Sequence, residues 1–407
     1  MTPLRNFFVL LVCAACAFSI GCGGSSSTKT NTIAQAGQNV APIIVNSGPA
    51  GNYANGAFTS VTMCVPGTST CQTIDGVLVD TGSFGLRILS SALTVALPQQ
   101  NAPSGNPVVE CLPFVASYTW GPVKTADVEI AGEKASSLPV QILSDSDFTV
   151  PSGCSAFGVP PGSPPADTLP ALGANGILGV GLLVQDCGAA CEQTGGANPG
   201  LYYECPASGC VVTAEALGQQ VANPVALFPT DNNGVIVELP AVTGGEASVS
   251  GSLVFGIGTE SNNGMGSAAV YTPDSNGFLT VTYKGTSYNQ SFIDSGSNGI
   301  FFLDSTSTGL PTCTPPPPGI SGFYCPASTK SFSVTNQGNN GTSGPVAFSV
   351  ANAENLFSNP SDFAFADLAG PNPNSFDWGL PFFFGRNVIV AIDGKSTPSI
   401  PGPYWAY

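Results

Sequence analysis

The hydrophobic residues of this chain occur in short runs that are separated by Gly, Pro, Ser and Asn. Residues 58–63 alternate apolar and polar side chains, a turn sequence with two cysteines follows, and residues 76–79 read Gly-Val-Leu-Val. Residues 278–283 and 290–293 repeat this order in the second half. Short alternating runs between turn residues are typical of β-strands, and short apolar runs are typical of buried strands. The pattern predicts an all-β chain with one hairpin and one buried strand in each half.

The same segment ends each of these buried strands. Residues 79–86 read Val-Asp-Thr-Gly-Ser-Phe-Gly-Leu, and residues 293–300 read Ile-Asp-Ser-Gly-Ser-Asn-Gly-Ile. Either copy alone is a common turn sequence, because Asp caps turns and Gly adopts positive φ. Two copies in one frame of flanking apolar residues indicate more than turn chemistry. They predict two half-molecules that each deliver one carboxylate, Asp80 and Asp294, to a shared site.

Length and composition set limits on the fold and on the chemistry. A chain of 407 residues exceeds what one hydrophobic core usually spans, so two lobes are expected. A net charge of −16 with nine Lys and Arg argues against a nucleic-acid partner. The absence of histidine excludes Ser-His-Asp and Cys-His mechanisms and histidine zinc sites. Proton transfer must therefore use carboxylates, Tyr, Lys, Cys or water.

The first residues contain, in sequence, the regions of an export signal. Residues 1–22 contain Arg5, an apolar run over residues 7–20, and Cys22 after a small residue. Residues 19–22, Ser-Ile-Gly-Cys, resemble the end of a bacterial lipoprotein signal, in which the cysteine is lipidated. Ordinary signal cleavage nearby is the alternative. With residues 23–45 as a flexible tether, the prediction is a lipid-anchored envelope protein, at the outer membrane or facing the periplasm, rather than a freely secreted one.

Cysteine usage agrees with export. Of the thirteen cysteines, those within residues 1–22 belong to the signal and to the anchor, and an even number remains. An even count in an exported chain indicates disulfides. The short spacings of 64 to 71, 205 to 210 and 313 to 325 favour local loops. A metal site is the weaker interpretation, because Cys187 and Cys191 lack zinc-knuckle spacing and the short Asp145-Ser-Asp147 sequence does not supply a calcium loop. We expect no metal and no cofactor.

Several further segments make the chain resemble the two-lobed, pepsin-like aspartic peptidases over about residues 50–400. The two Asp-Thr/Ser-Gly-Ser sequences are the strongest part of this resemblance. Residues 118–132 resemble the flap hairpin, and residues 250–256 resemble the first strand of the second lobe. The segments beside the two Asp loops are matched by residues 174–180 and 378–393. The cysteine-rich residues 186–210 have no counterpart in that pattern. No activation segment is recognisable before residue 53.

The resemblance implies a fold of two closed-barrel-like β lobes related by pseudo-two-fold symmetry. The first lobe is expected at residues 46–240 with the Asp80 loop and the flap, and the second at residues 241–407 with the Asp294 loop. Tyr118 would close over the substrate, with Trp120 in the same hairpin. The expected supporting residues are Thr81 and Ser295, which would reach across the lobe interface, Gly82 and Gly296, which let N–H groups approach the carboxylates, and Ser83 and Ser297, which would donate to the outer carboxylate oxygens.

Two aspartates at close range explain the chemistry that the resemblance implies. Two neighbouring carboxyl groups do not both ionise cheaply, so they share a proton and act as one acid and one base toward water and a peptide carbonyl. The leading hypothesis is an aspartic endopeptidase that acts on polypeptides as a monomer at acidic pH. The alternative is a non-catalytic peptide- or glycan-binding, adhesion-type protein on the same scaffold. A third hypothesis is a cell-surface structural protein without a ligand.

Overall fold

The strands lie where the alternation of side chains predicts them. The computed structural model describes residues 31–407 except 116, 146, 156–163 and 315–320. Residues 77–80 at the end of β3 are all buried, and residues 279–283 of β15 alternate between buried and half-buried. The predicted signal at residues 1–22, Cys22 and the first part of the predicted tether lie outside the described residues.

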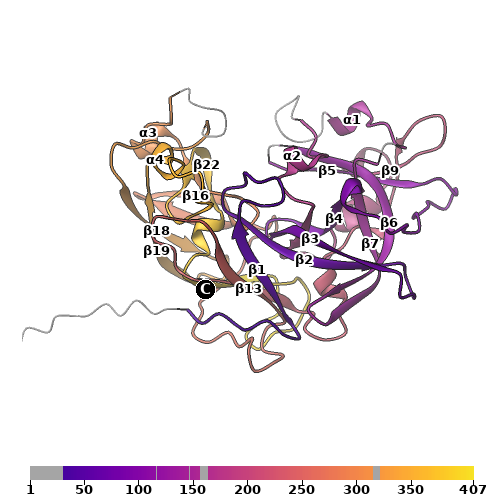
Figure 1. Ribbon diagram of the computed structural model, residues 1–407, viewed down its shortest axis with the longest axis horizontal. Coiled ribbons are helices and arrows are strands. Elements are labelled where there is room, and N and C mark those ends of the chain that lie inside the picture. Colours follow the sequence, from indigo (N-terminus) through magenta and orange to yellow (C-terminus); the bar gives the residue numbers. More distant parts are fainter. Residues whose placement is uncertain (1–30, 116, 146, 156–163, 315–320) are drawn as a thin grey trace, which may run out of the picture. The chain divides into compact units, whose positions relative to one another are not determined.

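The chain is mostly β and forms two barrel-like sheets, one closed barrel of six strands and one nearly closed barrel of seven. Pairing of β6 with β2 closes the first barrel. Its strands, purple to magenta in Figure 1, are β2 (Gly56–Cys64), β3 (Cys71–Asp80), β8 (Gly176–Val180), β4 (Phe84–Leu89), β7 (Glu133–Leu143) and β6 (Tyr118–Ile130). Strands β5 (Val108–Pro113), β9 (Tyr202–Glu204) and β10 (Val211–Val212) extend the sheet beyond β6.

The second barrel-like sheet belongs to the C-terminal half. In sheet order it contains β19 (Ser343–Val350), β18 (Lys330–Gln337), β15 (Leu279–Tyr283), β16 (Thr286–Ile293), β22 (Asn372–Trp378), β17 (Ile300–Leu303) and β21 (Ala369–Gly370). The prediction of two β barrels is confirmed. Strands β12 (Gly245–Glu246) and β20 (Ala364–Phe365) form a separate pair.

A run of six strands continues the first barrel into the second half of the chain. These strands are β1 (Val40–Asn46), β13 (Val249–Phe255), β11 (Gly234–Leu239), β23 (Arg386–Ala391), β24 (Tyr404–Ala406) and β14 (Val270–Tyr271). Contacts group residues 31–407 into one compact unit, and the predicted bounds at 240 and 241 fall just after β11. One prediction is wrong. The flexible tether does not extend to residue 45, because Val40–Asn46 pairs with both β13 and β2.

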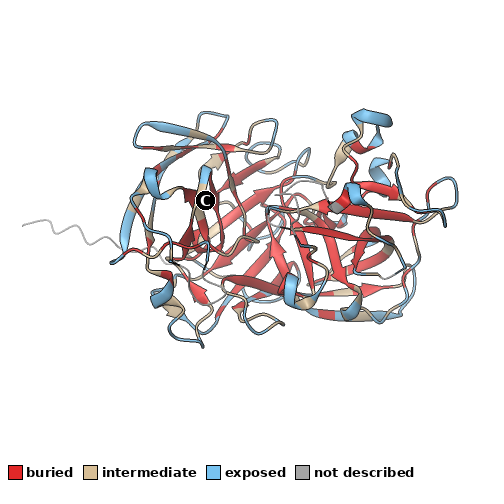
Figure 2. Ribbon diagram, turned by 90° about the horizontal axis from the view of Figure 1, so that it is seen from above, coloured by how far each residue is buried: buried red, intermediate tan, exposed pale blue. Residues whose placement is uncertain are grey.

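Helices are short throughout the described part of the chain. Most cover one turn between strands, and Figure 2 shows exposed residues (pale blue) on several of them and buried residues (red) along the strands. The α-helices are α1 (Ser152–Ser155), α2 (Leu169–Leu172), α3 (Ser305–Thr308) and α4 (Ala353–Leu356), and the 3₁₀ turns are η1 (Ser90–Ala92), η2 (Gly188–Glu192), η3 (Gly195–Ala197), η4 (Leu217–Gln219), η5 (Pro224–Leu227) and η6 (Leu380–Phe382). Of the helices within the described residues, none is long and apolar enough to cross a membrane.

Each half repeats one local arrangement around its aspartate. Strand β3 pairs in parallel with β8, which in turn pairs antiparallel with β4. Strand β16 pairs in parallel with β22, which pairs antiparallel with β17. Because the strands before and after each Asp loop share one neighbour, the loop is held on both sides. A Cβ at Gly179 would overlap the backbone of Phe84, and a Cβ at Gly379 would overlap that of Gly299, so both shared neighbours need glycine beside the loop.

Five disulfides join the ten cysteines outside the signal. The local pairs Cys64–Cys71, Cys205–Cys210 and Cys313–Cys325 confirm the loops that the spacing predicted. Cys187–Cys191 forms a further local pair, which is the preferred interpretation of these residues. Cys111–Cys154 joins β5 to α1 over 43 residues, and spacing did not predict it. Multiple disulfides indicate an extracytoplasmic protein.

Candidate active site

Asp80 and Asp294 stand at the start of two loops with the same hydrogen bonds. The N–H of Gly82 donates to Oδ1 of Asp80 at 2.8 Å, and the N–H of Gly296 donates to Oδ1 of Asp294 at 2.7 Å. The outer carboxyl oxygens accept hydrogen bonds from the two serine hydroxyls, as the motif predicts. Oγ of Ser83 donates to Oδ2 of Asp80, and Oγ of Ser297 donates to Oδ2 of Asp294 at 2.8 Å. Each carboxyl group therefore has one backbone donor and one hydroxyl donor.

The residues after the two aspartates lock the loops to each other. The N–H of Thr81 donates to Oγ of Ser295 at 3.1 Å, and the N–H of Ser295 donates to Oγ1 of Thr81 at 2.9 Å. Oγ of Ser295 also donates to the carbonyl of Val79 at 2.7 Å, and Oγ1 of Thr81 donates to the carbonyl of Ile293 at 3.4 Å. Both side chains are buried. This reciprocal set of bonds fixes the two loops in one relative position.

The two carboxyl groups lie close together. A Cβ on Gly82 would stand 2.5 Å from Cγ of Asp294, and a Cβ on Gly296 would stand 2.7 Å from Cγ of Asp80. Each carboxyl group therefore packs on the glycine of the opposite loop, which explains the need for glycine at both positions. Two carboxyl groups this close share one proton more readily than both ionise.

Burial and neighbouring charges favour this shared proton. Burial raises the pKa of Asp294 well above its ordinary value, and the charges of Asp80 and Asp377 raise it further. Burial, followed by the charges of Asp80 and Asp294, raises the pKa of Tyr53, which keeps this phenol neutral beside the pair. Whether Asp294 keeps its proton therefore depends on its acidic neighbours as well as on its own burial.

Asp377 is a third carboxyl group near the pair, and the motifs did not predict it. It lies on β22, only 4% exposed, and burial raises its pKa to about 8. Its place in the repeat was readable in the sequence. In the parallel pairing of each half, Ile177 stands opposite Leu78 and Asp377 stands opposite Phe292. An acid that replaces an apolar residue in one half of a repeat is the signal that would have found it.

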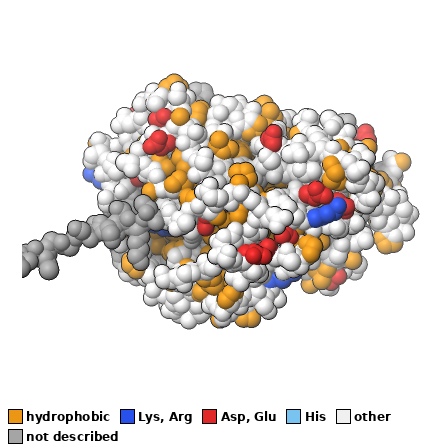
Figure 3. Space-filling view, turned by 60° about the horizontal axis from the view of Figure 1, so that its bottom comes forward, with side chains coloured by type: hydrophobic (Ala, Val, Ile, Leu, Met, Phe, Trp, Pro, Cys, Tyr) orange, Lys and Arg blue, Asp and Glu red, His pale blue; other side chains and the backbone are white. Residues whose placement is uncertain are grey.

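A cavity of about 920 Å³ lies over the two aspartates. Apolar side chains make much of its wall, including Phe84, Leu112, Phe114, Leu182, Phe278, Phe292 and Trp405. Asp186, Asp274 and Asp393 also line it, and none of the described lining residues is Lys or Arg. On the face shown in Figure 3, the blue Lys and Arg side chains are scattered and form no basic patch. An apolar wall around paired acids suits an extended chain with apolar side chains.

Tyr118 and Trp120 lie outside the lining of this cavity. Both are buried, and Nε1 of Trp120 donates to the carbonyl of Phe148 at 2.9 Å. Both lie on β6 near the turn of the β5–β6 hairpin, where Tyr118 pairs with Pro113 and Trp120 packs edge-on against Tyr203. Residues 112–115 at the tip of this hairpin line the cavity instead. Alternation predicts that these aromatic residues lie in a strand, but it does not tell which side of the hairpin lines the cavity.

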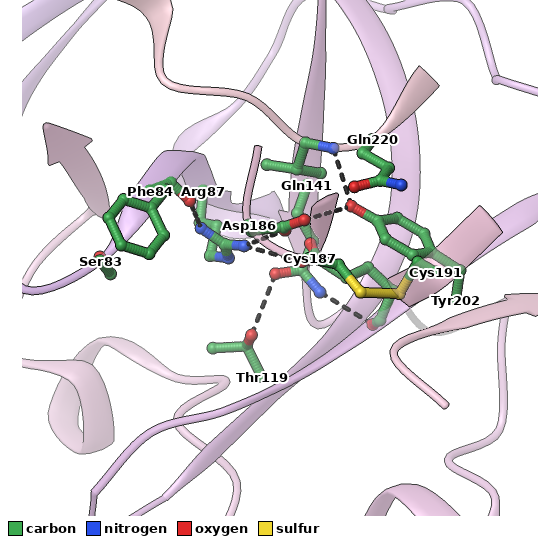
Figure 4. A network of polar contacts seen from close by, with 12 residues as sticks. Ser83, Phe84, Arg87, Thr119, Gln141, Asp186, Cys187, Cys191, Tyr202 and Gln220 are labelled. Carbon is green, nitrogen blue, oxygen red and sulfur yellow. Dashed lines mark hydrogen bonds and ion pairs between the residues drawn. A yellow bond between two sulfur atoms is a disulfide. The ribbon is translucent and has the colours of Figure 1, made fainter. Parts of the chain in front are cut away.

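A buried ionic network connects the first Asp loop to the cysteine-rich segment (Figure 4). Nη2 of Arg87 lies 2.7 Å from Oε1 of Glu110 and 2.7 Å from Oδ2 of Asp186. The hydroxyl of Tyr202 donates to Oδ1 of Asp186 at 2.7 Å, and Nη1 of Arg87 donates to the carbonyl of Phe84. Burial and the charge of Glu110 raise the pKa of Asp186 well above its ordinary value. The segment without a counterpart thus supports the wall of the cavity.

The described residues contain no group of three or more Cys, Asp and Glu arranged to hold a metal ion. The paired aspartates direct their oxygens at each other and at N–H and O–H donors. This arrangement can move protons, with one carboxyl group as acid and the other as base.

The comparisons with known proteins give one result for almost the whole chain. The model of a family described as a protein of unknown function (DUF3443) matches residues 35–407. No curated protein matches the chain.

Proposed function

We propose that this chain, which belongs to the DUF3443 family of proteins of unknown function, is an exported aspartic endopeptidase. One observation carries the proposal. Two Asp-Thr/Ser-Gly-Ser loops from different barrels are joined by the reciprocal bonds of Thr81 and Ser295, and they bring their two carboxyl groups together at an apolar cavity. The resemblance to the pepsin-like peptidases supports the same role for these residues.

The mechanism follows from the shared proton. A water molecule between Asp80 and Asp294 would lose a proton to the ionised carboxylate as its oxygen attacks the peptide carbonyl. The protonated carboxyl group would donate to the carbonyl oxygen, and a tetrahedral diol would form. Collapse of the diol would return a proton to the leaving nitrogen and release both products. Gly82, Gly296, Ser83 and Ser297 would hold the four carboxyl oxygens in position throughout.

The cavity and the predicted signal complete the proposal. Phe84, Leu112, Phe114 and Phe292 favour substrates with apolar side chains on both sides of the cleaved bond. Lipidation of Cys22 would tether the protein to the envelope. If so, Cys22→Ala shifts the protein from the membrane fraction to the soluble fraction after cell lysis. An unchanged distribution would exclude lipidation at Cys22.

Peptidase activity is tested with the full-length protein purified in detergent. A fluorescently labelled, denatured protein is the substrate between pH 3 and pH 7. We expect cleavage on the acidic side of neutral, and Asp80→Asn or Asp294→Asn should lower kcat/KM by at least about 100-fold, because each removes the acid or the base. Asp75→Asn is the matched control, since Asp75 is exposed on the same strand as Asp80. Cleavage that survives Asp80→Asn refutes the mechanism.

The position of Tyr118 and Trp120 favours a second candidate function, a peptide- or glycan-binding protein without catalysis. Neither aromatic side chain lines the cavity, so the hairpin brings no predicted aromatic over the carboxyl pair. A peptide with a hydroxyl isostere in place of the cleaved bond separates the two candidates. An endopeptidase binds it more tightly than the matching amide peptide. Equal binding of both peptides, with no cleavage by the wild type, supports the binding protein.

A further inference from the structure

The residue after each motif serine has its carbonyl group held by a side chain, but the donor differs between the two halves. In the first half this residue is Phe84, and Nη1 of Arg87 donates to its carbonyl at 2.6 Å. In the second half it is Asn298, and Nδ2 of Asn55 donates to its carbonyl at 2.8 Å. Asn55 lies 243 residues before Asn298. One Asp loop is therefore held from within its own half and the other from the opposite half.

The repeat explains why the second half needs a donor from elsewhere. The two Asp loops match at an offset of 214 residues, and at this offset Arg87 is matched by Phe301. Phe301 packs against an apolar cluster that includes Phe323, and a phenylalanine side chain has no hydrogen-bond donor. Phe301 therefore cannot do for the second loop what Arg87 does for the first.

Asn55 uses its whole amide group on the second half of the chain. Its side chain is completely buried. Besides the bond to Asn298, Nδ2 donates to the carbonyl of Phe365 at 3.0 Å, and Oδ1 accepts the N–H of Phe365 at 2.7 Å. The backbone N–H of Asn55 donates to the carbonyl of Phe363 at 2.7 Å. An ionised aspartate would bring oxygen atoms against two carbonyl oxygens, so the position requires an amide.

We propose that Asn55 is a positioning residue for the Asp294 loop, which it binds from the first half of the chain at the carbonyl next to Ser297. Its catalytic meaning rests on the proposed function. Oγ of Ser297 donates to Oδ2 of Asp294 at 2.8 Å, so Asn55 holds the loop directly beside a group that supports this carboxyl. The bonds between Thr81 and Ser295 hold the beginning of the loop, and Asn55 holds its end. These two attachments fix the distance between the two carboxyl groups, which sets how strongly they share a proton.

Asn39 provides a matched control. It is buried and has a φ of 57°, close to the 53° of Asn55. Its side chain also takes part in three hydrogen bonds, to Phe255 and Asn262, and none of them reaches an Asp loop. Glycine adopts positive φ readily, so Asn55→Gly and Asn39→Gly remove these bonds without straining the backbone. Each variant should raise the unfolding constant in denaturant about 100-fold. A wild-type unfolding constant for Asn55→Gly would overturn the proposal.

The coupling of the two carboxyl groups is measured without substrate. In full-length protein with carbon-13-labelled aspartate, NMR follows the titration of Asp80 and Asp294, and Asp80→Asn and Asp294→Asn assign the two signals. The gap between the two apparent pKa values of the pair reports the coupling. Asn55→Gly should narrow this gap by at least about half a pH unit, because a loosened loop lets the carboxyl groups separate. Asn39→Gly should keep the wild-type gap. An unchanged gap in Asn55→Gly, or equal narrowing in both variants, would overturn the proposal.

Activity at acidic pH gives the second measurement. Asn55 is not among the described residues that line the cavity. Asn55→Gly should therefore lower kcat about tenfold and change KM less than about threefold, because a misplaced carboxyl group impairs proton transfer more than substrate binding. Asn39→Gly should keep both constants within about twofold. A change in KM alone, or equal losses of kcat in both variants, would refute the positioning role. A wild type without cleavage would refute the proposed function alone, and the titration gap would still decide whether Asn55 positions the Asp294 loop.

Discussion

The hydroxyl of Ser295 is the most informative single group in the contact between the two Asp loops. Ser295→Ala removes two buried hydrogen bonds, the one that it accepts from the N–H of Thr81 and the one that it donates to the carbonyl of Val79. A buried polar group that loses its partner costs about 1–3 kcal/mol. Two such groups give an expected loss of about 2–6 kcal/mol in the free energy of unfolding. Thr81→Val removes the acceptor of the N–H of Ser295 and the longer bond to the carbonyl of Ile293, and should cost less than Ser295→Ala.

The two changes should not add. Once either loop is freed, the bonds that remain no longer hold two fixed partners, so the double variant should lose about 0.5–1 kcal/mol less than the sum of the single losses. Denaturant unfolding of the four proteins of this cycle measures the coupling. Ser399→Ala, at an exposed serine, is the control and should change stability by less than about 0.5 kcal/mol. A loss below about 1 kcal/mol for Ser295→Ala, or strict additivity, would refute the reciprocal lock.

Three further predictions concern the site and its supports. Gly82→Ala places a methyl group 2.5 Å from Cγ of Asp294. A displacement of this carboxyl group by about 1 Å should lower kcat/KM about 100-fold. The control Gly264→Ala, where a Cβ would meet open space, should leave kcat/KM unchanged. Wild-type activity in Gly82→Ala would show that the carboxyl group does not pack against Gly82. Burial raises the pKa of Glu215 from 4.5 to about 7. The stabilisation from this carboxyl group is thus complete below pH 4.5 and is lost as pH rises through 7. The free energy of unfolding of the wild type should therefore fall relative to that of Glu215→Gln between pH 5 and pH 7. Parallel curves for the two proteins would contradict this prediction. The two disulfides Cys111–Cys154 and Cys64–Cys71 close loops of 43 and 7 residues. Replacing each pair by alanine should lower the free energy of unfolding in denaturant by about 4 kcal/mol and about 2 kcal/mol, respectively. The reverse order would contradict the dependence on loop length.

The sequence predicted the parts of the fold that depend on neighbours along the chain. Alternating apolar and polar residues at 58–63 and 278–283 predicted strands there, because successive side chains of a strand point to opposite faces of the sheet. The repeated Asp-Thr/Ser-Gly-Ser segments placed the two loops, and short spacings placed three disulfides. These features are local, so a single sequence contains them.

Other features of the site depend on contacts between distant segments. Alternation showed that Tyr118 and Trp120 are in a strand but not that their strand turns them away from the cavity. Spacing did not pair Cys111 with Cys154, and the cysteine-rich segment gave no sign that Asp186 would bind Arg87. Each of these contacts depends on which distant segment packs against the residue, and a local sequence pattern does not contain this information.

Sequence alone therefore determined that this protein has two similar β halves, each with an aspartate at the end of a buried strand. Only the tertiary structure decided how the two carboxyl groups meet, through the reciprocal bonds of Thr81 and Ser295, and that Asp377 is close enough to raise the pKa of Asp294. The physical reason is the range of the interactions. Hydrophobic periodicity fixes which face of a strand is buried. The distance between the two carboxyl groups, and hence their shared proton, depends on how the closed and the nearly closed barrel pack.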